Sequence, residues 1–137
     1  MPELEIIMKK YPNAILTLNS AFYYYGLTDT IPDHYYVATP KSNRKIEDVR
    51  VKQIYENSNA FEMGKTTIEY DGVDITIYNE ERLLIELIRN KRKFSFDLYK
   101  EIISNYRKLI HKMDMTQIMD ANHQIGDFIN DFYTKAD

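Results

Sequence analysis

The sequence contains no cysteine, which excludes disulfide bonds, thiolate metal sites and cysteine nucleophiles. Histidine is scarce: three residues are scattered along the chain, and none stands in the HxxxH or HxH pairing typical of a metal site. The four glycines supply neither a GxxxxGKS/T nor a GxGxxG phosphate-binding loop, and no GxSxG nucleophile motif occurs. We therefore expect no metal, no cofactor and no catalytic residues of these types.

Long hydrophobic runs are also missing, since no stretch approaches the roughly 18 consecutive apolar residues of a membrane-spanning helix. The start of the sequence, MPELEIIMKK, has no basic segment followed by an apolar run, as a secretory signal would. These absences predict a cytoplasmic protein with no membrane partner.

Tryptophan is absent, whereas tyrosine is abundant, with 12 residues beside 6 phenylalanines. Tyrosine at this density is typical of half-buried positions, where the ring packs and the hydroxyl stays in water. A dedicated surface for stacking bases is the alternative interpretation. The length of 137 residues and the hydrophobic content of 44% predict one globular domain over residues 1–137.

The hydrophobic pattern predicts two short helices at the start of the chain. Residues 4–11 carry apolar side chains at helical spacing, and Pro12 ends the pattern. Residues 16–26 form the second predicted helix, in which the hydroxyl of Thr17 is a suitable N-cap and Gly26 a left-handed closing residue.

Strands are predicted in the middle of the chain, over residues 34–39, 49–55, 65–70 and 73–78. Asp71 and Gly72 connect the last two, and a two-residue Asp-Gly link favours a tight hairpin. Three capped helices and a last helix over residues 125–132 follow, and the expected caps are Asn79, Ser95 and Asp114. This order predicts an α+β fold, with a small, largely antiparallel sheet of about four strands flanked by N-terminal and C-terminal helices.

The net charge of −3 conceals two basic blocks. Residues 41–54 hold five bases against two acids, and residues 89–112 hold eight bases against two acids. Such blocks indicate an anionic partner such as nucleic acid, although a solvated helix end is an equal alternative for the second block. The candidate binding residues are the clustered cations of both blocks: Lys41, Arg44, Lys45, Arg50, Lys52, Arg89, Lys91, Arg92 and Lys93.

Residues 16–40, LTLNSAFYYYGLTDTIPDHYYVATP, resemble the AbiEi family of bacterial antitoxins in the order of helix, Gly-Leu, turn, Ile-Pro, strand and proline. A second similarity lies downstream, where the strand over residues 73–78 runs into a helix that opens with Glu-Arg. The basic run and amphipathic helix of residues 89–106 are also similar to the family's C-terminal domain. The chain departs from the family at Leu18 and Tyr25, where relatives often carry histidine.

The resemblance implies an antitoxin of a toxin–antitoxin or abortive-infection phage-defence system. Its functional partner would be a nucleotidyltransferase-like toxin, with which no stable complex is expected. Relatives also repress their own operon through an N-terminal winged helix-turn-helix, and too few residues precede Pro12 to form one. We therefore expect either a domain of a longer protein or a stand-alone version, with a dimerisation module as a further alternative and the oligomeric state open.

The Glu-Arg pair shared with the family suggests a structural role for Glu81, Arg82 and Glu86. At the start of a helix an acid such as Glu81 complements the helix dipole, and Arg82 can pair with Glu86 one turn later. We expect these residues to form a buried ion pair that joins the helix to the sheet.

One enzymatic alternative remains, a metal-dependent nuclease or phosphodiesterase that uses the acids near the predicted hairpin, Glu69, Asp71 and Asp74. Asp71 is also expected there for backbone reasons alone, since aspartate is common in turns. The sequence therefore predicts a protein that binds and does not catalyse.

Overall fold

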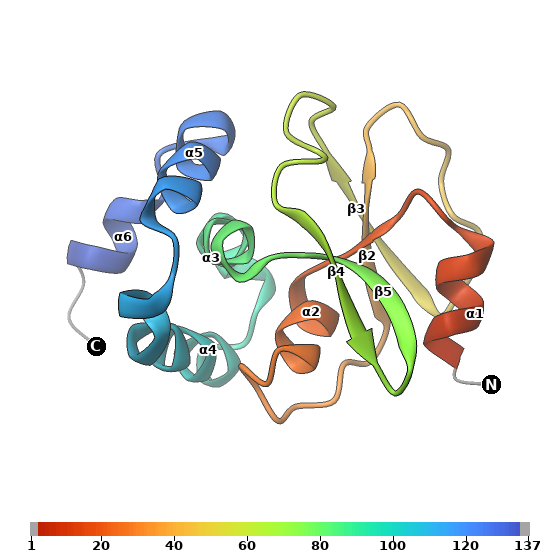
Figure 1. Ribbon diagram of the computed structural model, residues 1–137, viewed down its shortest axis with the longest axis horizontal. Helices are drawn as coiled ribbons and strands as arrows, with labels where there is room; N and C mark the ends of the chain where they lie inside the picture. The colour runs from red at the N-terminus through yellow and green to blue at the C-terminus, as the bar shows by residue number, and fades with distance from the viewer. Residues whose placement is uncertain (1–2, 135–137) are drawn as a thin grey trace.

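The computed structural model describes residues 3–134, which fold into a mixed five-stranded sheet and six α-helices (Figure 1). The fold class is α+β, as predicted. The strands are β1 (Ile15–Leu16), β2 (Tyr35–Pro40), β3 (Val51–Glu56), β4 (Lys65–Tyr70) and β5 (Val73–Tyr78). The helices are α1 (Glu3–Lys10), α2 (Leu18–Tyr24), α3 (Glu80–Arg89), α4 (Phe96–Leu109), α5 (Met115–Ile125) and α6 (Ile129–Thr134), with the short 3₁₀ turns η1 (Lys91–Lys93) and η2 (Ile110–Lys112).

The sheet differs from the predicted one in strand number and direction. Its order is β3-β2-β1-β5-β4, and the β1–β5 and β2–β3 pairs are parallel, whereas β1–β2 and β4–β5 are antiparallel. The prediction of about four largely antiparallel strands was therefore wrong. Strand β1 has two residues, too few to show an alternating pattern, and its Ile15 and Leu16 precede α2 so closely that they resemble the start of that helix.

The start of α2 also differs from the sequence prediction. Thr17 occupies the N-cap position, but its side chain makes no capping hydrogen bond, and its hydroxyl is buried without a partner. Its backbone N–H donates instead to the Tyr36 carbonyl at 2.9 Å, which ties the residue to β2. At the other end, Gly26 has a φ of +75° and closes the helix as predicted, with the Leu27 N–H reaching back to the Phe22 carbonyl at 2.9 Å.

The β4–β5 hairpin confirms the local turn prediction. Tyr70 pairs with Val73, and Asp71 and Gly72 have φ values of 52° and 79°. Both turn residues are thus left-handed, as a type I′ turn requires. The predicted caps of the later helices are confirmed as well. The side chains of Asn79, Ser95 and Asp114 accept hydrogen bonds from backbone N–H groups two or three residues later in the chain.

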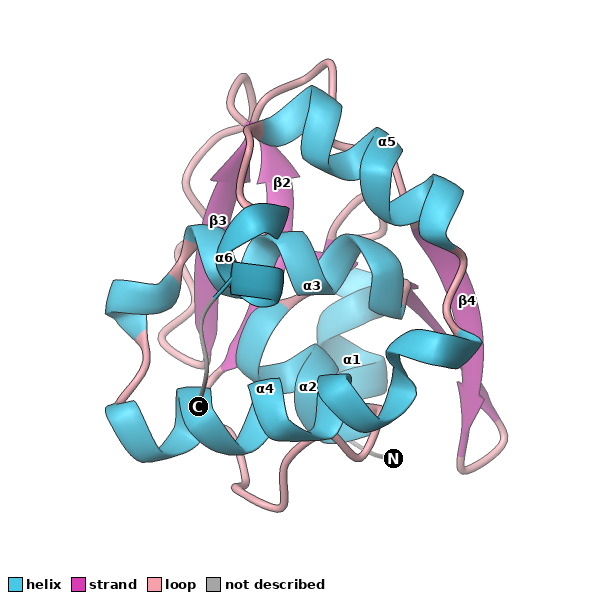
Figure 2. Cartoon of the chain, turned by 90° about the vertical axis from the view of Figure 1, so that its left-hand side faces the viewer, coloured by secondary structure: helices cyan, strands magenta, loops and turns pink. Residues whose placement is uncertain are grey.

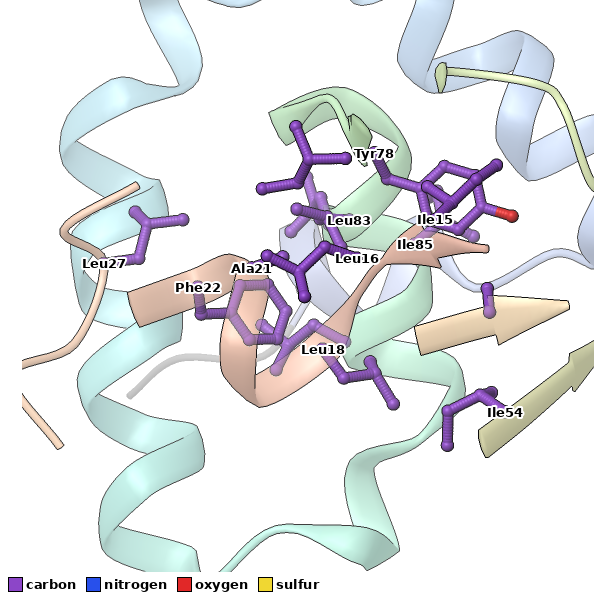
Figure 3. Packing of buried hydrophobic residues seen from close by; sticks show 14 of the residues in the cluster. Ile15, Leu16, Leu18, Ala21, Phe22, Leu27, Ile54, Tyr78, Leu83 and Ile85 are labelled. Carbon is purple, nitrogen blue, oxygen red and sulfur yellow. The ribbon is translucent and has the colours of Figure 1, made fainter. Parts of the chain in front are cut away.

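The helices lie on two sides of the sheet. Helix α1 lies on one side, and α2 to α6 lie on the other, with α4 in the outer layer (Figures 1 and 2). The buried cluster fills the space between the sheet and α2 to α4, where Phe22 packs edge-on against Tyr106 with ring centroids 6.3 Å apart and Leu83 is fully buried (Figure 3). Residues 3–134 contain no helix with the length and apolar content needed to cross a bilayer.

Candidate functional site

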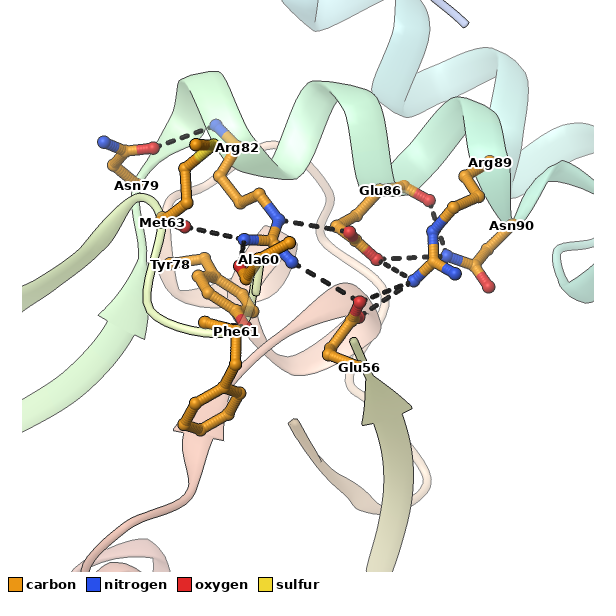
Figure 4. A network of polar contacts seen from close by, with 10 residues as sticks. All are labelled: Glu56, Ala60, Phe61, Met63, Tyr78, Asn79, Arg82, Glu86, Arg89 and Asn90. Carbon is orange, nitrogen blue, oxygen red and sulfur yellow. Dashed lines mark hydrogen bonds and ion pairs between the residues drawn. The ribbon is translucent and has the colours of Figure 1, made fainter. Parts of the chain in front are cut away.

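A buried network of charges joins α3 to the sheet (Figure 4). At its centre is Arg82, whose side chain is 1% exposed. Its Nε donates to Oε2 of Glu86 at 3.1 Å, and its Nη1 donates to the backbone carbonyls of Ala60 and Met63 in the β3–β4 connection. Its guanidinium also lies over the Tyr78 ring, 4.2 Å from the centroid. A single side chain therefore fixes the connection, β5 and α3 relative to one another.

Arg89 and Glu56 complete the network. Nη2 of Arg89 lies 2.9 Å from both carboxylate oxygens of Glu56 and 2.6 Å from Oε1 of Glu86. Nη2 of Arg82 also donates to Glu56, at 3.4 Å. The two arginines and two glutamates balance in charge when both glutamates are ionised, and paired charges are tolerated in the interior better than single ones.

The two glutamates of the network differ in pKa. Burial and the neighbouring carboxylate of Glu86 raise the pKa of Glu56 to about 8. Burial opposes ionisation of Glu86 too, but the guanidinium groups of Arg82 and Arg89 outweigh it and lower the Glu86 pKa. A proton that enters the network therefore resides on Glu56.

The predicted structural ion pair is present in part. Arg82 and Glu86 pair as described, but Glu81 lies outside the network and accepts the backbone N–H of Asp114 at 2.9 Å. Sequence reasoning missed Glu56, which lies 26 residues before Arg82 and one residue beyond the predicted strand over residues 49–55. The available signal was its place at the end of β3, where it follows the buried Ile54 at a spacing of two residues and shares its face.

Arg89 was predicted to be a binding cation, and the structure assigns it to the network instead. Its side chain is 29% exposed, and its guanidinium contacts two buried carboxylates. It ends α3 three residues after Glu86, one turn along the same face. Its charge is therefore engaged inside the protein.

The first basic block packs beside α1. Arg50 pairs with Asp48 at 2.7 Å and with Glu3 of α1 at 3.3 Å, and Lys10 of α1 lies 3.7 Å from Asp48. The Arg50 side chain holds the pKa of the Asp48 carboxyl well below its usual range. The exposed members of this block are Lys41, Arg44, Lys45 and Lys52.

The second basic block lies on the other side of the sheet. Lys91, Arg92 and Lys93 form η1 between α3 and α4, and all three are exposed. In Figure 1 the sheet separates this turn from the connection over residues 41–50 beside α1. The structure therefore does not bring the two basic blocks together on one face.

A groove beside η1 combines cations with aromatic rings. Its volume is about 710 Å³, and it runs along the outer face of α4 to α6. Lys91 lies over the Tyr99 ring at 5.3 Å, and Lys100 lies over the Phe96 ring at 5.7 Å. We call this site the α4 groove; its lining residues are Lys91, Arg92, Phe94, Phe96, Tyr99, Lys100, Ile103, Arg107, Asp131 and Phe132.

The α4 groove carries a strong excess of positive charge. Four of its lining residues are cations, and Asp131 is the one acid among those described. Sequence reasoning named Lys91 and Arg92 but missed Phe96 and Lys100. The signal for the latter pair was helical spacing, because residues four apart on α4 lie on the same face of the helix.

The acids of the enzymatic alternative lie on the exposed β4–β5 hairpin. Glu69 pairs with Asp74 across the strands, while Asp71 occupies the turn. Within residues 3–134 no group of three or more His, Cys, Asp or Glu side chains is placed to hold a metal ion. These three carboxylates therefore do not converge on a common point.

The comparisons with known proteins add no relative. No protein-family model matches the chain, and no curated protein matches it in sequence. The likeness to AbiEi antitoxins thus rests on the order and spacing of the motif residues alone.

Proposed function

We propose that this chain is an AbiEi-type antitoxin domain that works in the cytoplasm by binding an anionic target through η1 and α4. One observation carries the proposal: the three consecutive cations of η1 are exposed and form no ion pair within residues 3–134. Repulsion among adjacent cations is unfavourable, and none of the described carboxylates forms an ion pair with these three to offset it. An anionic partner bound at η1 would offset this repulsion.

The residues that carry the family resemblance have structural roles that fit a related fold. Gly26 closes α2 before the turn that leads to β2, and Arg82 of the Glu-Arg pair anchors α3 to the β3–β4 connection. These roles explain why such residues would recur in a common architecture. They support the proposed kinship, and with it a nucleotidyltransferase-like toxin as functional partner and a link to control of its own operon.

The alternative of a metal-dependent nuclease or phosphodiesterase has less support. Glu69, Asp71 and Asp74 are spread along an exposed hairpin, whereas metal catalysis of phosphodiester cleavage uses carboxylates that meet at one ion or at two adjacent ions. A binding mechanism needs no such convergence.

The proposal is tested by growth rescue during co-expression with the toxin encoded beside this chain. The triple variant Lys91→Glu, Arg92→Glu, Lys93→Glu is expected to lose rescue, because it turns the η1 cations into three anions. The control is the variant Arg44→Glu, Lys45→Glu, which changes exposed charges on the α1 side and is expected to retain rescue. Arg89 stays unchanged in both, since its loss would damage the buried network.

Thermal unfolding of both variants checks that each is folded. Because the substituted side chains are exposed, we expect midpoints close to that of the wild type. Full rescue by the folded η1 variant would remove this surface from the mechanism.

A further inference from the structure

We propose that the α4 groove binds single-stranded nucleic acid, with Phe96 as the platform on which one unpaired base stacks. This inference rests on the proposed function and specifies its anionic target. Two observations carry it: Phe96 is exposed to solvent in the groove, and four cations line the same groove.

The ring of Phe96 is 76% exposed, although burial of a phenylalanine side chain is strongly favoured. Phe96 lies in the first turn of α4, and this helix is held in place by the buried side chains of Ile102 and Tyr106. An exposed aromatic ring on a rigid element is suited to stacking, because every base has a π-face that it can cover.

Four cations line the α4 groove together with this platform. Lys100 lies beside the Phe96 ring, and Lys91 and Arg92 approach from η1 at one end, with Arg107 at the other. A backbone of phosphates that follows the groove would meet each of them. Proteins that bind single-stranded nucleic acid generally combine a positively charged groove with aromatic side chains on which the bases stack.

The geometry favours a single strand over a duplex. Bases in a duplex are stacked and paired, so a side-chain ring on a helix surface can stack only on a base that is already unpaired. The volume of about 710 Å³ falls within the range of small-ligand sites and accommodates a short stretch of strand, not a double helix.

Fluorescence anisotropy with labelled oligonucleotides of about ten residues tests the inference, a length that spans one such groove. The probes are oligouridylate and oligothymidylate, which separate RNA from DNA, and a duplex of equal length. We expect the wild-type chain to bind at least one single strand more tightly than the duplex. Phe96→Ala is expected to bind about tenfold more weakly or worse, and Phe96→Trp to retain binding.

Two further variants separate stacking from charge. Lys100→Gln is expected to lower the slope of log K against log salt by about 0.7, the value for one phosphate contact on a single strand. Tyr55→Ala, which removes an aromatic ring that is 40% exposed on β3, serves as the control and should bind like the wild type. Binding by Phe96→Ala as tight as that of the wild type, or no wild-type binding to either single strand at low salt, overturns the inference.

Failure here is distinguishable from failure of the proposed function. If the η1 triple variant loses rescue while Phe96→Ala keeps both binding and rescue, the anionic target is real but does not stack in the α4 groove. If the η1 triple variant keeps rescue, the proposed function fails whatever the oligonucleotides show.

Discussion

Removal of Arg82 should destabilise the protein more than any surface change. Arg82→Ala leaves the fully buried Glu86 with Arg89 as its remaining cation, and it leaves the Met63 carbonyl without its donor. The Ala60 carbonyl keeps its hydrogen bond from the Met63 N–H. Breaking a buried ion pair by removal of one partner costs about 3–5 kcal/mol. The Met63 carbonyl left unsatisfied adds about 1 kcal/mol.

The expected loss of stability is large relative to the free energy of unfolding of the whole domain. A domain of this size has a free energy of unfolding of about 5–15 kcal/mol, so Arg82→Ala should remove a third of it or more. At roughly 3 °C for each kcal/mol, a loss of about 4–6 kcal/mol should lower the thermal midpoint by about 12–18 °C. Circular dichroism at fixed pH and salt measures this shift.

Arg50→Ala is the matched control. Arg50 also contacts two carboxylates, those of Asp48 and Glu3, but its own side chain is 37% exposed, so its charge is partly solvated by water. When Arg50 is removed, Asp48 keeps Lys10 at 3.7 Å, so the loss should be small. Its midpoint should stay close to that of the wild type. Equal midpoints for Arg82→Ala and Arg50→Ala would refute the reasoning, because burial would then make no difference to an arginine with two partners.

Stability should also depend on pH, through Glu56, and on the room for a side chain at two glycines. Because the pKa of Glu56 is raised to about 8 from its usual 4.5, the folded chain binds this proton more tightly than the unfolded chain. The stabilisation from Glu56 is therefore complete below pH 4.5 and is lost as the pH rises through 8, so the midpoint should fall over this window and Glu56→Gln should flatten the profile. A wild-type midpoint that stays constant across the same window would contradict the assignment. Gly64→Ala should destabilise far more than Gly26→Ala in denaturant titrations, because the added Cβ at Gly64 lies 2.5 Å from Cβ of Arg82, whereas at Gly26 nothing lies within 4 Å. Both positions have positive φ, so equal losses would show that the contact with Arg82 can relax.

Features set by short-range chemistry could be predicted from the sequence. Asn79, Ser95 and Asp114 cap helices because their side chains reach N–H groups two or three residues away. The Asp71-Gly72 turn follows from the left-handed conformations that these two residues tolerate. Strand β1 could not be predicted, because two residues gain a sheet partner only through contacts with β2 and β5.

The roles of the cations in the candidate site also depend on contacts between residues far apart in the sequence. Arg89 and Lys91 stand two residues apart in one basic run, yet Arg89 ends α3 within reach of Glu56, while Lys91 begins η1 and faces the solvent. The difference depends on where α3 ends and on a strand more than thirty residues away. Charge counts cannot separate engaged cations from free ones, whereas the structure does.

An NMR titration of the ¹⁵N-labelled chain with the short single-stranded oligonucleotide tests the central claim, that this protein works through the surface of η1 and α4. We predict that shifts of backbone amide signals concentrate in η1 and in the first half of α4 around Phe96. Shifts confined to the connection over residues 41–50 or to the β4–β5 hairpin, or no shifts at all, would contradict it.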